Sequence, residues 1–192
     1  MRTLLVALVA VPFVGCAPPS PSHVVDDVAL FTPRWAFEPW ISKDISTGPD
    51  MRDFIAGFQE RDIPVGVAVL DSPWETNYNT FVPNEDRYPD FAGYVADLRA
   101  EGIRTVLWTT QMVNDSSFDI EEGGDTYAGP APTFVEGQDQ HYFVNDGETA
   151  LWWKGTGAAV DFFNPAARDW WHAQQKLVLD AGVAGFKLDF GD

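Results

Sequence analysis

The chain alternates between helical and strand-like patterns of hydrophobic residues. Three segments, "ERDIPVGVAVLD", "AEGIRTVLWTT" and "DAGVAGFKLDF", each repeat a helix end, a tight turn and a short apolar strand. Short strands that alternate with amphipathic helices are typical of βα units on a parallel sheet. With "RWAFEPW" as a first strand, the pattern predicts an α/β fold with four strands.

The segments before these strands carry apolar residues at helical spacing. The predicted stripes are Met51, Phe54, Ile55 and Phe58 in the first helix, Phe91, Val95 and Leu98 in the second, and Trp170, Ala173, Leu177 and Ala181 in the third. The third helix also has clear ends, because Asn164 can cap it, Pro165 suits its first turn and Gly182 stops it.

A long stretch, about Gln111 to Val160, separates the third strand from the fourth. It is rich in Gly, Asp and aromatic residues and shows only weak periodicity. Loops of this length in compact domains are usually functional. In a parallel barrel we expect it on the catalytic face, where it would help to build the substrate subsites.

The last strand, within "GFKLDFGD", has two faces of different chemistry. Phe186, Leu188 and Phe190 share one face by alternation, and Lys187 and Asp189 share the other. A nearby lysine would favour the ionised form of Asp189, and an ionised carboxylate in a cleft is what a covalent nucleophile needs. A buried Lys–Asp pair that only orders a core is the other interpretation, and the strand alone does not decide between them.

Three successive strands end in residues suited to binding and attacking a sugar. Asp71 closes "VGVAVLD", Trp108 closes "TVLW" and Asp189 closes "FKLDF". A carboxylate can bind hydroxyls, an indole can stack on a sugar ring, and a second carboxylate can perform chemistry. Active sites of parallel barrels lie at the carboxyl ends of the strands, so the three endings together predict a site there.

Composition narrows the class of partner. The 192 residues contain 29 acidic and 12 basic side chains, for a formal net charge of -17. This charge argues against nucleic acid and against an anionic membrane surface, which both require basic patches. It is compatible with a neutral substrate such as a sugar. The three histidines, His23, His141 and His172, lack the spacing of metal ligands, so we expect neither a metal nor another cofactor.

The first sixteen residues have the pattern of an export signal. Arg2 precedes a short apolar run from Leu4 to Val14, which is too short to span a bilayer. The run ends in "FVGC", which resembles a bacterial lipoprotein signal and implies lipidation of Cys16. Residues 17–30 would then be a flexible tether on the bacterial cell envelope, with the lipid as the only contact with the membrane. An ordinary secretory signal with an unpaired cysteine is the alternative.

Five segments resemble glycoside hydrolase family 31, the retaining α-glycosidases built on a (β/α)8 barrel. They are "RWAFEPWISKD", "DIPVGVAVLDSPW", "NEDRYPDFAGYVADLRAEGIRTVLWTTQMVN", "AAVDFFNPAARDWW" and "GFKLDFGD". The resemblance implies that Asp189 is the nucleophile, with Lys187 beside it, and that Asp71 binds sugar hydroxyls. It further implies a sugar subsite lined by Trp108, Trp153, Phe37 and Trp40. The Phe-Lys-x-Asp-Phe-Gly form is similar to bacterial α-xylosidases, although Asp192 stands where that form usually has Glu.

The resemblance to a barrel of about 250 residues implies that residues 31–192 form only its N-terminal part. We therefore expect a partial (β/α)8 barrel of about four βα units with a long insertion between strands 3 and 4. The family's general acid/base lies downstream, so the chain, read as a truncated product, should be nearly inactive by itself. Its sugar, linkage and oligomeric state stay undetermined. Two alternatives are a non-catalytic carbohydrate-binding lipoprotein and an α-galactosidase of a related barrel family.

Overall fold

The computed structural model describes residues 32–189, and the residues from Pro33 onward form one compact unit. The predicted signal peptide with Cys16 and the predicted tether lie outside the described residues, as do Phe190 and Asp192. No helix among residues 32–189 has the length and apolar character needed to cross a bilayer.

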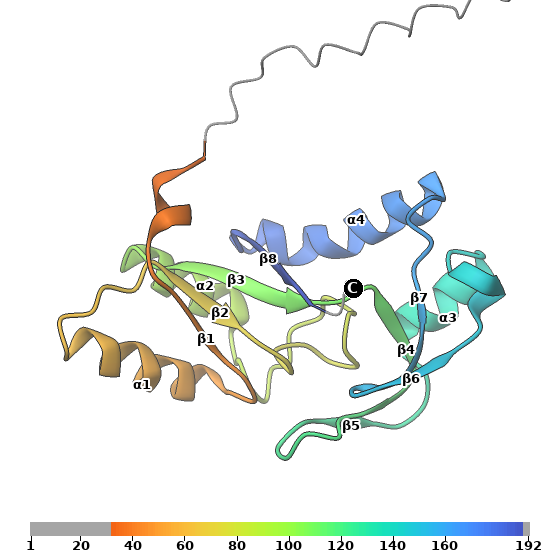
Figure 1. The fold of residues 1–192 in the computed structure, drawn as a ribbon, viewed down its shortest axis with the longest axis horizontal. Coiled ribbons are helices and arrows are strands. Elements are labelled where there is room, and N and C mark those ends of the chain that lie inside the picture. Colours follow the sequence, from red (N-terminus) through yellow and green to blue (C-terminus); the bar gives the residue numbers. More distant parts are fainter. Residues whose placement is uncertain (1–31, 190–192) are drawn as a thin grey trace, which may run out of the picture. The chain divides into compact units, whose positions relative to one another are not determined.

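Four parallel strands form the barrel sheet (Figure 1). They are β1 (Trp40–Lys43), β2 (Val67–Leu70), β3 (Arg104–Thr109) and β8 (Gly185–Leu188), and they lie side by side in that order. The register aligns Lys43 with Leu70, Leu70 with Leu107, and Leu107 with Phe186, so the carboxyl ends of all four strands meet at one edge. The predicted four-stranded α/β arrangement is confirmed.

Three helices cover one face of the barrel sheet. They are α1 (Gly48–Gln59), α2 (Phe91–Ala100) and α4 (Pro165–Asp180). A single hydrophobic core joins buried helix residues such as Met51, Val95 and Trp171 to Ala68 and Leu107 of the sheet. Each helix begins with a side-chain cap, supplied by Thr47, Asp90 and Asn164 respectively. These caps satisfy backbone N–H groups that have no partner within the helix.

The opposite face of the barrel sheet has a smaller apolar cluster. Val67, Val69 and Val106 are buried there, and Trp35 packs against them. Trp35 belongs to η1 (Arg34–Phe37), a short 3-10 helix, and its ring stacks on that of Trp40 with a centroid distance of 5.8 Å. These two indoles cover the amino-terminal end of this face, opposite the end where the predicted site residues lie.

Two predicted details of the barrel elements are wrong. "RWAFEPW" was expected to be a strand, but it forms η1 and strand β1 begins only at Trp40, after Pro39. Proline lacks the N–H that a strand needs within a ladder, so the strand starts after it. In α4, Ala173 and Leu177 are exposed, and Ala167, Trp171 and Val178 are buried with Trp170. The buried stripe is therefore shifted around the helix from the predicted one.

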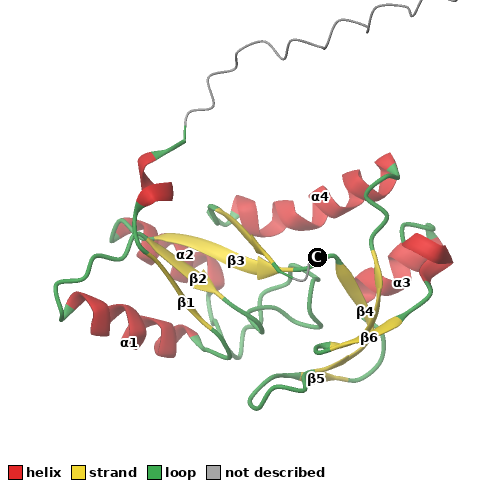
Figure 2. Ribbon diagram, viewed as in Figure 1, coloured by secondary structure: helices red, strands yellow, loops and turns green. Residues whose placement is uncertain are grey.

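The stretch between β3 and β8 is folded and does not form the loop that its weak periodicity suggested. It contains a second, antiparallel sheet in the order β5-β4-β7-β6. The elements are β4 (Met112–Phe118), β5 (Thr126–Tyr127), α3 (Pro132–Asp139), η2 (Val144–Gly147), β6 (Ala150–Trp152) and β7 (Gly155–Ala159). We call residues 111–160 the insertion. It lies beyond the ends of the barrel strands toward which their arrows point (Figure 2).

The loop after β2 is ordered by a buried carboxyl group. Glu75 has no exposed surface, and its two oxygens accept the backbone N–H groups of Asn79 and Phe81 at 2.7 Å and 2.6 Å. Asn79 and Phe81 have positive φ angles of 61° and 56°, in the region that L-residues seldom adopt. Glu75 thus stabilises a strained loop that packs between the barrel sheet and the insertion.

Candidate active site

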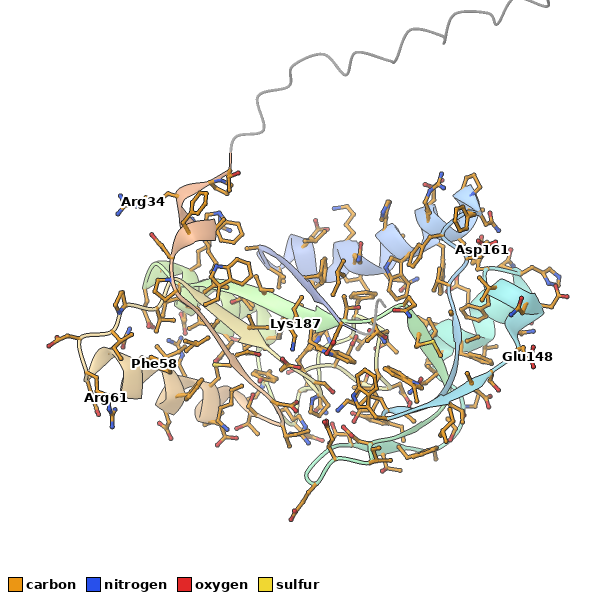
Figure 3. All side chains as sticks on the ribbon, in the orientation of Figure 1. Arg34, Phe58, Arg61, Glu148, Asp161 and Lys187 are labelled. Atoms are coloured by element: carbon orange, nitrogen blue, oxygen red, sulfur yellow. The ribbon has the colours of Figure 1, made fainter. Side chains whose placement is uncertain are left out.

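Lys187, labelled in Figure 3, extends from β8 to Asp71 at the carboxyl end of β2, and Asp189 follows the last residue of β8. The Lys187 ammonium donates a hydrogen bond to Asp71 Oδ2 at 2.7 Å and lies 3.9 Å from Asp189 Oδ2. The sequence predicted that Lys187 would pair with Asp189 on the shared face. The structure brings all three groups together but makes Asp71 the nearer partner of the lysine.

Trp108 fixes the position of Asp189. Its indole N–H donates to Asp189 Oδ2 at 2.9 Å, and the Asp189 backbone N–H donates to the carbonyl of Thr109 at 2.9 Å. Trp108 is only 1% exposed and stacks in parallel with Trp152, with an interplanar angle of 3°. The indole is therefore held by packing, and in turn it orients the half-exposed carboxylate of Asp189.

Asp71 is buried, and its oxygens are largely occupied by protein donors. Oδ2 accepts from Lys187 and from the Ser42 hydroxyl at 2.7 Å, and Oδ1 accepts from the backbone N–H of Ser72 at 2.9 Å. A carboxylate has about four acceptor sites, so the donors among residues 32–189 leave one site on Oδ1 for a ligand.

The neighbours of Lys187 stabilise its cationic form. Burial lowers the pKa of Lys187, but the hydrogen bond and the charge of Asp71, helped by Asp189, outweigh burial and raise it. The site therefore contains a stable ammonium–carboxylate pair with Asp189 at its edge.

These side chains line a pocket of about 200 Å³, which we call the strand-end pocket. Its lining residues are Asp44, Asp71, Ser72, Trp108, Glu121, Trp153, Lys154, Lys187 and Asp189. The barrel sheet supplies one wall, and the insertion supplies Glu121, Trp153 and Lys154. A second pocket, of about 510 Å³, also includes Asp189 and is lined further by Phe162, Trp171 and His172.

The structure does not bring Phe37 and Trp40 to this pocket. Phe37 lies in η1 with 78% of its surface exposed, and Trp40 pairs with Val67 at the amino end of the sheet. They lie at the wrong end because the first strand begins later than the sequence suggested. Of the predicted residues, the pocket contains Asp71, Trp108, Trp153, Lys187 and Asp189.

Sequence reasoning missed five residues of the pocket or its support: Ser42, Asp44, Ser72, Glu121 and Lys154. Ser42 and Asp44 could have been found if the strand had been started after Pro39, because alternation then places both on the pocket face. Lys154 had a weak signal as the one charged residue in "LWWKGTG". Glu121 carried no signal, since it lies in an acidic loop of the insertion.

Asp44 lies at the pocket mouth among other acidic groups. Partial burial, followed by the charges of Glu121 and Asp71, raises the pKa of the Asp44 carboxyl. Within residues 32–189, no group of three or more His, Cys, Asp or Glu side chains has an arrangement that could hold a metal ion. The lining residues of the strand-end pocket supply carboxylates, ammonium groups, indoles and the hydroxyl of Ser72.

A sequence profile for the "Glycosyl hydrolases family 31 TIM-barrel domain" matches residues 29–192. The chain belongs to glycoside hydrolase family 31. This assignment agrees with the resemblance seen in the sequence and removes the alternative of a different barrel family.

Two curated relatives of this family 31 chain are α-xylosidases. The chain is 31% identical over 169 residues to one from Emericella nidulans and 28% identical over 189 residues to one from Lactiplantibacillus pentosus. These matches cover 83% and 91% of this chain but only 20% and 23% of the relatives, so the chain spans about a fifth of their length.

Solved structures of family 31 enzymes share the fold. A dextranase from Flavobacterium johnsoniae, complexed with glucose, superposes with a TM-score of 0.69 at 22% identity, over 82% of this chain and 19% of that one. An α-xylosidase from a soil metagenome, complexed with xylose, gives a TM-score of 0.62 at 18% identity, over 82% and 22% of the two chains. The four parallel strands are therefore part of a TIM barrel.

Proposed function

We propose that the chain carries the nucleophile of a retaining α-glycosidase that hydrolyses O-glycosidic bonds, with α-xylosides as the favoured substrate class. The observation that supports it most is the convergence of Asp71, Trp108, Lys187 and Asp189 on one pocket at the carboxyl ends of parallel strands. Membership of family 31 and the similarity to α-xylosidases point to the same chemistry.

In this proposal Asp189 attacks the anomeric carbon, forming a C–O bond as the bond to the leaving group breaks. The Trp108 N–H orients the attacking carboxylate, and Lys187 provides positive charge beside it. Asp71 accepts a hydrogen bond from a sugar hydroxyl at its remaining Oδ1 site. Retaining hydrolysis also requires a second carboxyl group about 5–5.5 Å from the nucleophile, which protonates the leaving oxygen and then activates water. We expect that group from elsewhere in the barrel.

The test uses a glycosyl fluoride, because fluoride leaves with little need for protonation. Covalent labelling of the protein then depends mainly on the nucleophile. Treatment with 5-fluoro-α-xylosyl fluoride should release fluoride and leave the sugar covalently bound to the peptide that contains "KLDFGD". Asp189→Asn should abolish labelling. Asp71→Asn should weaken sugar binding and slow labelling, because a hydroxyl contact and the main partner of Lys187 are lost.

Asp180→Asn is the matched control, because Asp180 is an exposed carboxylate on α4 whose only charged partner among the described residues is Lys176. It should label like the parent. Label on a carboxylate other than Asp189, or undiminished labelling in Asp189→Asn, would refute the assignment. Sugar binding without any labelling of the parent would favour the alternative, a non-catalytic carbohydrate-binding protein.

A further inference from the structure

Lys154 is buried to a degree that lysine seldom reaches. It occupies the two-residue turn between β6 and β7, directly after Trp153, and its side chain is 1% exposed. Its ammonium lies 2.8 Å from Asp119 Oδ2, contacts Glu121 Oε2 and stands 5.7 Å from the centre of the Tyr78 ring. A buried ammonium is tolerated only when it is paired and hydrogen-bonded, so these partners account for its burial.

Asp119 alone is sufficient as the counter-charge of Lys154. Its side chain has no exposed surface, and its Oδ2 also accepts the Tyr78 hydroxyl at 2.9 Å. Lys154, Asp119 and Tyr78 thus form a buried, charge-balanced unit. Glu121 brings a second negative charge that the burial of Lys154 does not require, so its presence needs another explanation.

Glu121 faces the strand-end pocket. Its side chain is 43% exposed and lines the pocket together with Asp71, Trp108 and Asp189. Lys154 binds its Oε2, and no described residue donates a hydrogen bond to its Oε1. A carboxylate that is already anchored at one oxygen loses little side-chain freedom when the other binds a ligand. Glu121 is therefore preorganised as an acceptor for a hydroxyl group.

We propose that Glu121 is a specificity-determining residue that accepts a hydrogen bond from a sugar hydroxyl in the strand-end pocket, and that Lys154 is the positioning residue that holds it. This inference rests on the proposed glycosidase function. Lys187 balances the charge of Asp71 and Asp119 balances that of Lys154, so Glu121 adds to the negative charge that Asp44 and Asp189 leave around the pocket. The arrangement should therefore select neutral sugars and reject sugars that carry a carboxylate.

The test measures the dissociation constant and the limiting rate of labelling by 5-fluoro-α-xylosyl fluoride. In Glu121→Gln, which keeps the Lys154–Asp119 pair, the dissociation constant should rise about 10-fold to 100-fold, as expected for a lost charge-assisted hydrogen bond. The limiting rate should change by less than about threefold, because Glu121 does not perform the chemistry. Glu122→Gln is the control: it removes the same charge from the next residue, which is exposed and does not line the pocket, and it should behave as the parent.

A second readout tests the selectivity. Glucose should protect the parent from labelling much better than glucuronate does, and Glu121→Gln should reduce that preference by about 10-fold. If the parent is labelled on Asp189 but Glu121→Gln has an unchanged dissociation constant and sugar preference, the inference is wrong and the proposed function stands. If the parent is not labelled, the proposed function fails and this inference fails with it.

A double-mutant cycle tests the role of Lys154. The turn keeps its backbone bonds when the side chain changes, since Ile120 N–H donates to the Trp153 carbonyl at 3.0 Å and Phe118 N–H donates to that of Lys154 at 3.2 Å. Lys154→Met removes the ammonium that anchors Glu121, so it should weaken sugar binding as Glu121→Gln does. The two changes together should weaken binding no further than either change alone. Additive effects in a double variant that unfolds like the Lys154→Met single variant would show that Lys154 does not act through Glu121.

Discussion

Glu75 should make the stability of this chain depend on pH in a direction opposite to that of most acidic residues. Complete burial raises the pKa of the Glu75 carboxyl from its ordinary value of 4.5 to about 8, although the N–H groups of Asn79 and Phe81 oppose the rise. The native state therefore retains a proton that the unfolded chain releases between these two values. As the pH rises through this window, the free energy of unfolding falls.

The size of the effect follows from the same values. One pH unit corresponds to about 1.36 kcal/mol per proton, so a rise in pKa from 4.5 to about 8 corresponds to about 5 kcal/mol of stability. This amount is present below pH 4.5 and has been lost once the pH exceeds about 8. Small domains have total stabilities of about 5–15 kcal/mol, so the loss should be plainly visible.

The assay is urea-induced unfolding followed by tryptophan fluorescence, at pH values from about 5 to about 9. Glu75→Gln should be less stable than the parent at pH 5, by about 1 kcal/mol, because its amide nitrogen cannot accept one of the two N–H bonds. It should become relatively more stable as the pH rises. Glu60→Gln, at the exposed end of α1, should show the parent's pH dependence. A stability difference between the parent and Glu75→Gln that stays constant across this range would refute the reasoning.

Two further predictions concern other parts of the chain. Asn79→Ala should lower the free energy of unfolding by about 3 kcal/mol or more, because the buried Asn79 amide forms hydrogen bonds with Thr109, Thr110 and Met112. A decrease of less than about 1 kcal/mol in urea unfolding would contradict this. In a bacterial host, radiolabelled fatty acid should enter the parent and be absent from Cys16→Ala, whereas equal labelling of both would show that Cys16 is not lipidated.

The fold was predictable wherever helical and strand periodicities differ clearly. The α1 and α2 stripes and the strands β2, β3 and β8 follow directly from apolar spacing and turn residues. The insertion was not predictable in this way, because its strands bury polar residues such as Asn114 and Ser117 and expose Leu151, and because its order comes from contacts distant in sequence. Asn114, for example, donates to the Lys154 carbonyl and accepts from the Trp152 indole, 38 residues away.

The site was predictable where it depends on strand alternation. Asp71, Trp108, Lys187 and Asp189 meet because the parallel register aligns the ends of their strands. The pairing within the group was not predictable, since whether Lys187 lies closer to Asp71 or to Asp189 depends on the spacing of neighbouring strands. Glu121 was equally hidden, because its approach to the pocket depends on the three-dimensional path of the insertion.

The order of strands in the barrel sheet has a consequence for biosynthesis. Strands β1, β2 and β3 can pair one after another as the chain leaves the ribosome, and Ser42 can then bind Asp71 early. Lys187 follows Asp71 by 116 residues, which corresponds to on the order of ten seconds of translation at about 5–20 residues per second. During that interval Asp71 lacks its ammonium partner. Docking of β8 brings Lys187 to Asp71 and Asp189 to Trp108 in a single step. The nascent chain therefore acquires these two contacts of the strand-end pocket only when its last described strand joins the sheet.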